Sequence, residues 1–153
     1  MKKLAIIATK GTLDWGYPPF ILASTAAALG YDVQVFFTFY GLQLLKKDLN
    51  LQVTSLGNPG MPMPMPMPVL LQALPGMQGM MTAMMKKKMA DKGVADLKEL
   101  RELCQEADVK FIACQMTVDL FEMEPKEFID GVEYAGAAMF FEFAGESDIC
   151  LFI

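Results

Sequence analysis

A cysteine at the end of an apolar run is the residue of this chain best suited to chemistry. Cys114 closes the run Phe111–Cys114, which is typical of a buried strand, and Thr117 follows as a residue able to cap a helix. Parallel α/β proteins bind ligands where their strands end, and the positive end of a helix dipole favours a thiolate there. The position therefore predicts sulfur chemistry at Cys114, with a buried structural cysteine as the simpler interpretation.

The two other cysteines are weaker candidates. Cys104 lies on the apolar stripe of an expected amphipathic helix, Val94–Ala107, where it either fills the core or acts as a second thiol. Cys150 is expected in the core, inside the last apolar run. Three widely spaced cysteines do not resemble a disulfide framework, and the apolar run after Lys3 is too short for a signal peptide. We therefore expect free thiols in a reducing cytoplasm.

The loop after the first expected strand opens on the same sheet edge as Cys114. Its glycines match neither the Rossmann nor the Walker pattern, so it forms either a wall of the cysteine pocket or a plain turn with aromatic packing. The residues expected to line the pocket are Lys10, Gly11, Trp15, Gln115 and Thr117.

The composition excludes several classes of function. The chain of 153 residues has no histidine, which removes Ser-His-Asp and Cys-His catalysis and most catalytic zinc sites. Its formal net charge of −5 disfavours nucleic acid as a partner. We expect no metal site and no cofactor. Copper at the methionines is disfavoured because alternating prolines would splay the sulfur atoms and histidine is absent.

Most of the chain's 14 methionines lie between Met61 and Met89, where they begin as a Met-Pro repeat. The sequence carries no charge from residue 49 to residue 85, yet its prolines rule out a membrane-spanning helix. We expect one domain over residues 1–153 with a Met/Pro-rich insertion at about 57–90. The repeat favours an extended conformation, and the segment from about Gly60 to Met89 is expected to be mobile or ordered only by packing on a neighbouring subunit.

Alternating apolar runs and helical patterns predict a flavodoxin-like three-layer α/β sandwich with about five mostly parallel strands. A helix over Phe20–Leu29, with Pro18 and Pro19 in its first turn, separates the first two strands. The content of 54% hydrophobic residues and the crowded Phe140, Phe141 and Phe143 predict a homo-oligomer. The expected strands are Lys3–Ala8, Asp32–Phe37, Leu51–Leu56, Phe111–Cys114 and Asp148–Phe152, with a further short strand considered at Val132–Tyr134.

Four strings in this order resemble the DsrE/DsrF/DsrH-like family, in particular its soluble, methionine-rich branch that carries a "peroxiredoxin-like" label. They are KGTLDWGYPPFILASTAAALG, FFTFYGLQLLKK, the Met-Pro tract leading to GMMTAMMKKKM, and ACQMTVDLF. The resemblance implies a small oligomeric flavodoxin-like protein that carries sulfur in the cytoplasm. It also implies a persulfide on Cys114, a second cysteine at the place of Cys104, and relay between a rhodanese-type donor and a TusA-type carrier. The peroxidase label does not fit, because the peroxidatic motif is absent.

A persulfide carrier needs an accessible thiolate and no general base, so the absence of histidine does not weaken this interpretation. Two alternatives remain open. One is a non-catalytic assembly or binding module that uses the methionine-rich segment to dock on a partner or membrane surface. The other is a small-ligand binder, for instance of a nucleotide, at the sheet edge.

Overall fold

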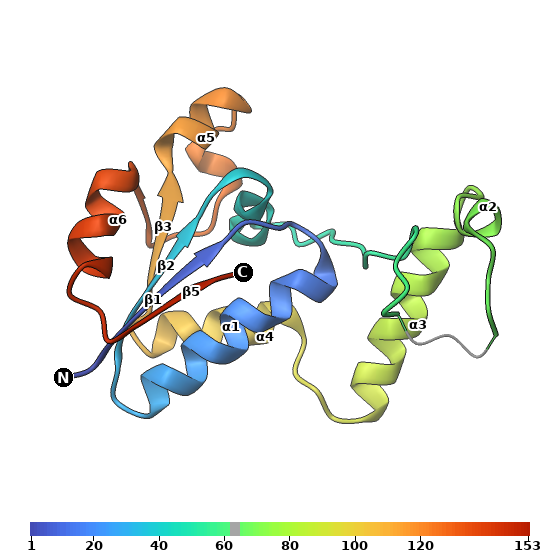
Figure 1. Cartoon of the computed structure of the whole chain (residues 1–153), viewed down its shortest axis with the longest axis horizontal. Coiled ribbons are helices and arrows are strands. Elements are labelled where there is room, and N and C mark those ends of the chain that lie inside the picture. The colour runs from blue at the N-terminus through green and yellow to red at the C-terminus, as the bar shows by residue number, and fades with distance from the viewer. Residues whose placement is uncertain (62–64) are drawn as a thin grey trace.

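The computed structural model describes residues 1–61 and 65–153, and a parallel sheet lies at its centre (Figure 1). Within this part of the chain the sheet has five strands, in the order β4-β3-β2-β1-β5, and every pairing is parallel. The prediction of a mostly parallel sheet is confirmed. The strands are β1 (Lys3–Ala8), β2 (Asp32–Phe37), β3 (Lys110–Cys114), β4 (Val132–Ala135) and β5 (Ile149–Phe152).

Helices cover the two faces of the sheet unequally. α1 (Leu13–Ala28) and α4 (Leu97–Glu106) pack on one face, and α6 (Ala137–Ala144) lies on the other (Figure 1). This is the three-layer arrangement that the sequence predicts. α2 (Val69–Gln72) and α3 (Met77–Asp91) lie to the side of the sheet, beyond α1 (Figure 1). The remaining helices are the 3-10 helix η1 (Phe39–Leu45), α5 (Gln115–Leu120) and the 3-10 helix η2 (Pro125–Glu127).

The core divides between the two faces because successive strand residues point to opposite sides. On the α1 side, the ring of Phe20 lies 5.9 Å from that of Phe37 and 5.7 Å from that of Phe111. On the α6 side, Phe36 stacks on Phe140 at 5.1 Å, in a smaller buried cluster that also contains Cys114. The candidate cysteine therefore lies on the more thinly covered face.

The strand predicted at Leu51–Leu56 is wrong. This segment pairs with no strand of the described sheet. Its backbone is held by other partners: the N–H of Val53 donates to Thr82 Oγ1 at 3.0 Å, and the N–H of Thr54 donates to Asp14 Oδ1 at 2.8 Å. The segment thus links α3 to the start of α1. The fifth strand is instead β4, at the place of the shorter run considered at Val132–Tyr134.

α1 begins at Leu13, before the prolines that were expected in its first turn, so Pro18 and Pro19 lie inside the helix. The start is fixed by tertiary contacts. The N–H of Leu13 donates to the carbonyl of Gln52 at 2.9 Å, which satisfies a donor at the open end of the helix. Local propensity placed the start at the prolines because they cannot donate to the preceding turn.

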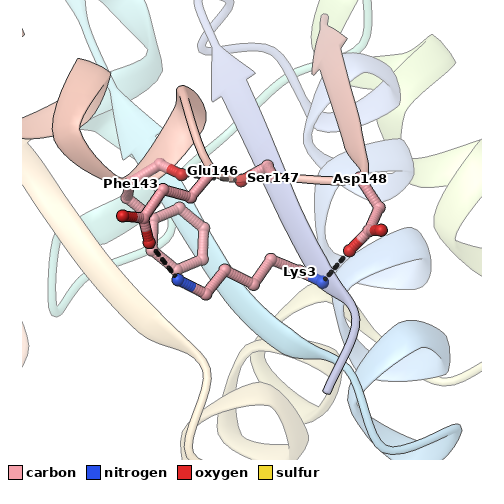
Figure 2. Close-up of polar contacts among 5 residues, drawn as sticks. All are labelled: Lys3, Phe143, Glu146, Ser147 and Asp148. Carbon is pink, nitrogen blue, oxygen red and sulfur yellow. Dashed lines mark hydrogen bonds and ion pairs between the residues drawn. The ribbon is translucent and has the colours of Figure 1, made fainter.

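Cys150 is exposed, so its expected place in the core is wrong. It lies on β5, an edge strand that pairs only with β1 in the described sheet. Lys3 holds this edge in register: its N–H donates to Asp148 Oδ2 at 2.8 Å, and its ammonium contacts Glu146 Oε2 at 2.7 Å (Figure 2). The exposed ion pair contributes little by itself, but the backbone contacts attach β5 to β1.

We refer to residues 65–92, with α2 and α3, as the arm. The arm is attached to the body of its own chain, because buried Met81 belongs to the main core and Gln78 Nε2 donates to the Val53 carbonyl at 3.1 Å. This packing on its own chain differs from the expectation of order supplied by a neighbour. The extended conformation expected for the Met-Pro repeat falls partly on residues 62–64, outside the described residues. No described helix combines the length and apolar character needed to cross a bilayer.

Candidate functional site

Cys114 is the last residue of β3, next to the centre of the sheet, and its side chain is 5% exposed. Gln115 begins α5 directly after it, so Cys114 itself occupies the N-cap position. Thr117, expected to cap this helix, lies within its first turn instead. The sequence therefore places the thiol correctly at the strand end but assigns the cap to the wrong residue.

Two threonine hydroxyls lie beside the thiol. Thr38 follows β2, the neighbouring strand, and its Oγ1 lies 3.3 Å from Oγ1 of Thr117, which is fully buried. The N–H of Phe39 donates to Thr117 Oγ1 at 3.2 Å. This oxygen accepts from Phe39, so the Thr117 proton can go to one of two neighbouring acceptors, Thr38 Oγ1 or Cys114.

The surroundings of Cys114 have opposing effects on its pKa. Burial alone would raise the pKa of the thiol. The hydroxyl and N–H of Thr117, the hydroxyl of Thr38 and the N–H of Met116 stabilise the thiolate, and together they lower the pKa below its ordinary value. The neutral thiol makes no capping hydrogen bond of regular geometry, so we expect these contacts to shorten once the proton leaves.

A group of exposed aromatic side chains lies at the same end of the sheet. Tyr40 stacks on Phe121 at 5.9 Å, and Phe39 meets Phe121 edge-on at 6.1 Å. Phe39 has a φ of 50°, in the left-handed region that a non-glycine residue rarely adopts. This conformation accompanies the N–H contact with Thr117, so a strained residue supports the hydroxyl beside the thiol.

Sequence reasoning missed Thr38, Phe39 and Phe121. A usable signal was present for two of them, because Thr38 and Phe39 directly follow Phe37, the last residue of a correctly predicted strand. In a parallel sheet, the residues after one strand lie beside those after its neighbour, so the end of β2 belongs with the end of β3. Phe121 gave no comparable signal.

The residues that follow β1 contact one another and the segment 54–60. Lys10 Nζ lies 3.9 Å from the ring centroid of Trp15, a cation–π contact. Trp15 lines a hollow of about 520 Å³ with Asp14, Pro18 and the segment 54–60, and Cys114 is not among its lining residues. No described hydrogen bond joins Lys10 or Trp15 to Cys114.

Gly11 and Gln115 also take other roles than lining the thiol. A Cβ on Gly11 would collide with the carbonyl oxygen of Tyr40, so this glycine allows the first loop to pack against η1. Gln115 is exposed, and its amide donates to Asp119 Oδ1 at 2.8 Å within α5. Of the five residues expected to line the pocket, the described contacts therefore bring only Thr117 to Cys114.

Cys104 differs sharply from Cys114. It is fully buried on α4, and its thiol donates to the carbonyl of Phe20 at 3.4 Å. Burial raises the pKa of Cys104 to about 12, and a backbone contact with Ser24 offsets only part of this effect. A neutral thiol sealed in the core is a poor nucleophile, which favours the interpretation of Cys104 as a core residue.

The surroundings of Cys114 favour the thiolate over the neutral thiol. A thiol whose pKa is lowered has a larger thiolate fraction, and the thiolate is the reactive form. In the part of the chain that the structure describes, no three His, Cys, Asp or Glu side chains gather in a way that suits a metal ion.

A sequence model of the DsrE/DsrF/DrsH-like family matches residues 1–152, nearly the whole chain. The chain belongs to this family. It is 82% identical over 156 residues to a protein of Allochromatium vinosum named "Sulfur carrier protein DsrE2", with 99% of this chain and 98% of the relative covered. It is 34% identical over 157 residues to "Uncharacterized protein YrkE" of Bacillus subtilis, with 99% and 97% covered.

Solved structures support the same fold for this family member. The crystal structure of the ychN protein from E. coli matches with a TM-score of 0.59 over 100% of both chains, at 13% sequence identity. At this identity the likeness concerns the fold alone. The resemblance inferred from the four sequence strings is confirmed by the family match.

Proposed function

We propose that this protein is a sulfur carrier that holds sulfane sulfur as a persulfide on Cys114. The observation that carries the proposal is the lowered pKa of Cys114 at the edge of the sheet, in contrast to the raised pKa of Cys104. The relative that is 82% identical bears the name of a sulfur carrier, which supports the same role. Such a thiol must stay reduced between cycles, and the cytoplasm provides that condition.

The transfer step needs only thiolate chemistry. The Cys114 thiolate attacks the outer sulfur of a donor persulfide, a new sulfur–sulfur bond forms, and the donor's own sulfur–sulfur bond breaks. The electron pair of the broken bond leaves with the donor thiolate, so no external oxidant or reductant is consumed. Attack by an acceptor thiolate on the outer sulfur of the Cys114 persulfide then regenerates the Cys114 thiolate.

The surroundings of Cys114 suit a sulfur that must be held and then released. The Thr38 and Thr117 hydroxyls that stabilise a thiolate would equally stabilise the negative charge of a bound persulfide. Because Cys114 is only 5% exposed, a partner's sulfur reaches it only when the residues around it move aside, and the same burial shelters the sulfur from unwanted oxidants. We propose a rhodanese-type donor and a TusA-type acceptor, both of which carry their sulfur on a protein cysteine.

The test compares two variants that differ only at position 114. Cys104→Ala with Cys150→Ser leaves Cys114 as the single thiol, and the partner variant adds Cys114→Ser. Each reduced protein is incubated with polysulfide, or with a rhodanese charged by thiosulfate, and its intact mass is measured. We expect the first variant to gain one sulfur atom that dithiothreitol removes, and the second to gain none.

Removal of Cys150 is essential in this design because its thiol is exposed and would accept sulfur without any role in function. Equal loading of both variants would contradict the assignment of the site. Failure of Cys114 to load from any donor would favour the alternative of a non-catalytic binding module. That alternative has one observation in its favour, the exposed apolar surface of the arm.

A further inference from the structure

Five large apolar side chains are exposed on the two segments that follow β2 and β3. Tyr40 is 64% exposed, Met116 is 63% exposed and Leu120 is 58% exposed. Phe39 and Phe121 complete the group, at 42% and 37%. Single exposed apolar residues are common, but a group of five at one end of a sheet needs an explanation. We refer to these five residues as the docking surface.

The aromatic members of the docking surface hold one another in place. The rings of Tyr40 and Phe121 are stacked with their planes 16° apart, and Phe39 meets Tyr40 edge-on at 6.3 Å. The backbone is unusual at both ends of this group, since φ is 50° at Phe39 and 52° at Glu122. Left-handed backbone at a residue other than glycine is destabilising, and here it accompanies exposed rings. Ordered, exposed aromatic groups are typical of the central contacts in protein interfaces.

The docking surface adjoins the residues that stabilise the Cys114 thiolate. Phe39 directly follows Thr38, and Met116 lies beside Thr117 in the first turn of α5. Thr38 and Thr117 carry the two hydroxyls beside the thiol. Sulfur exchange requires the partner's sulfur to come within bonding distance of Cys114, which is about 2 Å. A protein that exchanges sulfur with Cys114 is therefore placed against the segments that carry the docking surface.

Acidic residues border the docking surface on α5 and the turn after it. Asp119, Glu122 and Glu124 are exposed, and residues 115–125 include no basic residue. Glu124 forms an ion pair with Lys126, whereas the ion pairs of the described residues include neither Asp119 nor Glu122. The segment of η1 carries no charge. The docking surface is therefore an apolar area with a negative border.

We propose that the docking surface binds the protein with which Cys114 exchanges sulfur, and that this partner surrounds its own cysteine with apolar and basic side chains. The apolar side chains would cover the exposed rings, and the basic ones would pair with Asp119 and Glu122. A second copy of this chain fits less well, because its acidic border would meet the first one. The proposal rests on the persulfide function proposed for Cys114.

A consequence for the order of events follows from the position of the docking surface. The donor delivers its outer sulfur to Cys114, and the acceptor removes that same sulfur, so both proteins must reach one atom. They would therefore use the docking surface in turn. A small donor such as polysulfide is too small to need this surface, and this difference separates docking from the chemistry.

The test compares a protein donor with a small donor. The starting protein carries Cys104→Ala with Cys150→Ser, so that Cys114 is its single thiol, and Tyr40→Ser with Leu120→Ser is then added. Loading from limiting thiosulfate-charged rhodanese and from polysulfide is followed by intact mass over time. We expect the added substitutions to slow loading from rhodanese at least about tenfold. Loading from polysulfide should keep its rate, because neither side chain is among the groups that stabilise the thiolate.

The matched control for the apolar contacts is Leu29→Ser with Leu103→Ser. These two leucines lie on or next to α1 and α4 and are 73% and 49% exposed. The control should accept sulfur from both donors at the rates of the starting protein.

The negative border is tested by Asp119→Asn with Glu122→Gln. Loading from rhodanese should become slower at low salt and less sensitive to added salt, because the attraction that salt screens is lost. The matched control is Asp91→Asn with Glu106→Gln, two exposed acidic residues away from Cys114 whose replacement makes the same change in net charge. This control should keep both the rate and its salt dependence.

Four outcomes would overturn the proposal. The first is an unchanged rate of loading from rhodanese in Tyr40→Ser with Leu120→Ser, and the second is an equal loss in its matched control. The third is a similar loss with rhodanese and with polysulfide, which would show an effect on the thiol. The fourth is a starting protein that loads from polysulfide but takes nothing from rhodanese.

Two further measurements complete the design. If Tyr40→Ser with Leu120→Ser changes the oligomeric state in light scattering and leaves the rate with rhodanese intact, the docking surface is an interface between copies. Circular dichroism of each variant confirms that slower loading is not a loss of fold. A starting protein that loads from neither donor would instead contradict the persulfide function itself, so the two failures are distinguishable.

Discussion

Thr117 links the backbone of one loop to the thiol on another element. Its oxygen accepts the N–H of Phe39 at 3.2 Å and lies 3.3 Å from the Thr38 hydroxyl. The Phe39 N–H holds this hydroxyl in place, and the hydroxyl stabilises the Cys114 thiolate. The reactivity of the cysteine therefore depends on a residue one turn away in α5 and on the conformation of a loop from the neighbouring strand.

Replacing Thr117 by valine should raise the pKa of Cys114, since the hydroxyl that stabilises the thiolate is lost. The rate of alkylation by iodoacetamide at neutral pH should fall, because the loss of thiolate outweighs the higher nucleophilicity of a more basic thiolate. The measurement is the pH profile of alkylation at Cys114, with Thr117→Ser as the control that keeps the hydroxyl. An unchanged profile in Thr117→Val would show that the hydroxyl does not act on the thiol.

Cys104 should resist alkylation until the protein unfolds, because its thiol is buried and its pKa is raised to about 12. Peptide mapping after iodoacetamide treatment of native and denatured protein checks this. Rapid alkylation of Cys104 in the native protein would contradict this prediction.

The raised pKa of Cys104 predicts how the free energy of unfolding depends on pH. In the unfolded chain Cys104 ionises near 9.0, whereas in the folded chain it stays protonated up to about 12. The folded state should therefore lose about 1.4 kcal/mol per pH unit between these values relative to lower pH. Urea unfolding of the unmodified protein and Cys104→Ala over this range isolates the effect, which should be absent from the variant.

Arg101 shows how one side chain fixes an element that precedes the site. It is 3% exposed on α4, and its guanidinium donates to the carbonyls of Leu44 at 2.9 Å and Lys46 at 2.6 Å, at the end of η1. Arg101→Met should reduce the free energy of unfolding by about 2–4 kcal/mol, because two carbonyls lose charged donors. Urea unfolding measures this, with Lys98→Met on the exposed side of α4 as control. If Arg101→Met reduces the free energy of unfolding no more than Lys98→Met does, Arg101 does not stabilise η1.

The elements differ in how far the sequence determines them. β1 and β2 match their apolar runs to the residue, since buried parallel strands require such runs. Leu51–Leu56 has a similar composition, but side chains of Asp14 and Thr82 replace the partner strand, and no local pattern reveals such tertiary contacts. α4 begins at Leu97, three residues after the predicted Val94, and the capping box of Asp96 and Glu99 is the local signal that could have indicated this start.

The candidate site was predictable at its nucleophile and less so around it. Cys114 follows from the strand end alone, whereas Thr38 requires knowledge that β2 and β3 are neighbours. We keep one expectation about the elements as a proposal, that residues of about 57–90 form an insertion in a single domain over 1–153.

The whole molecule leaves a second apolar surface uncovered, on the α6 side of the sheet. Phe141 on α6 is 68% exposed, and Phe152 on the edge strand β5 is 74% exposed. We propose that this surface forms the interface of a homo-oligomer, distinct from the arm. Phe141→Asp with Phe152→Asp should then shift the protein to a monomer in light scattering. A clean monomer for the unmodified protein at micromolar concentration would refute the proposal.

The contact between Lys10 and Trp15 has an optical consequence. Trp15 is the one tryptophan of the chain, so the tryptophan fluorescence of the protein arises at a single known place. Its ring lies beneath an ammonium group and lines the same hollow as Pro18, Leu56 and Pro59. If the segment 54–60 moves away from α1, the indole becomes more hydrated and its emission shifts to longer wavelength. The protein thus carries a built-in reporter of the junction between its body and its arm, readable without any label.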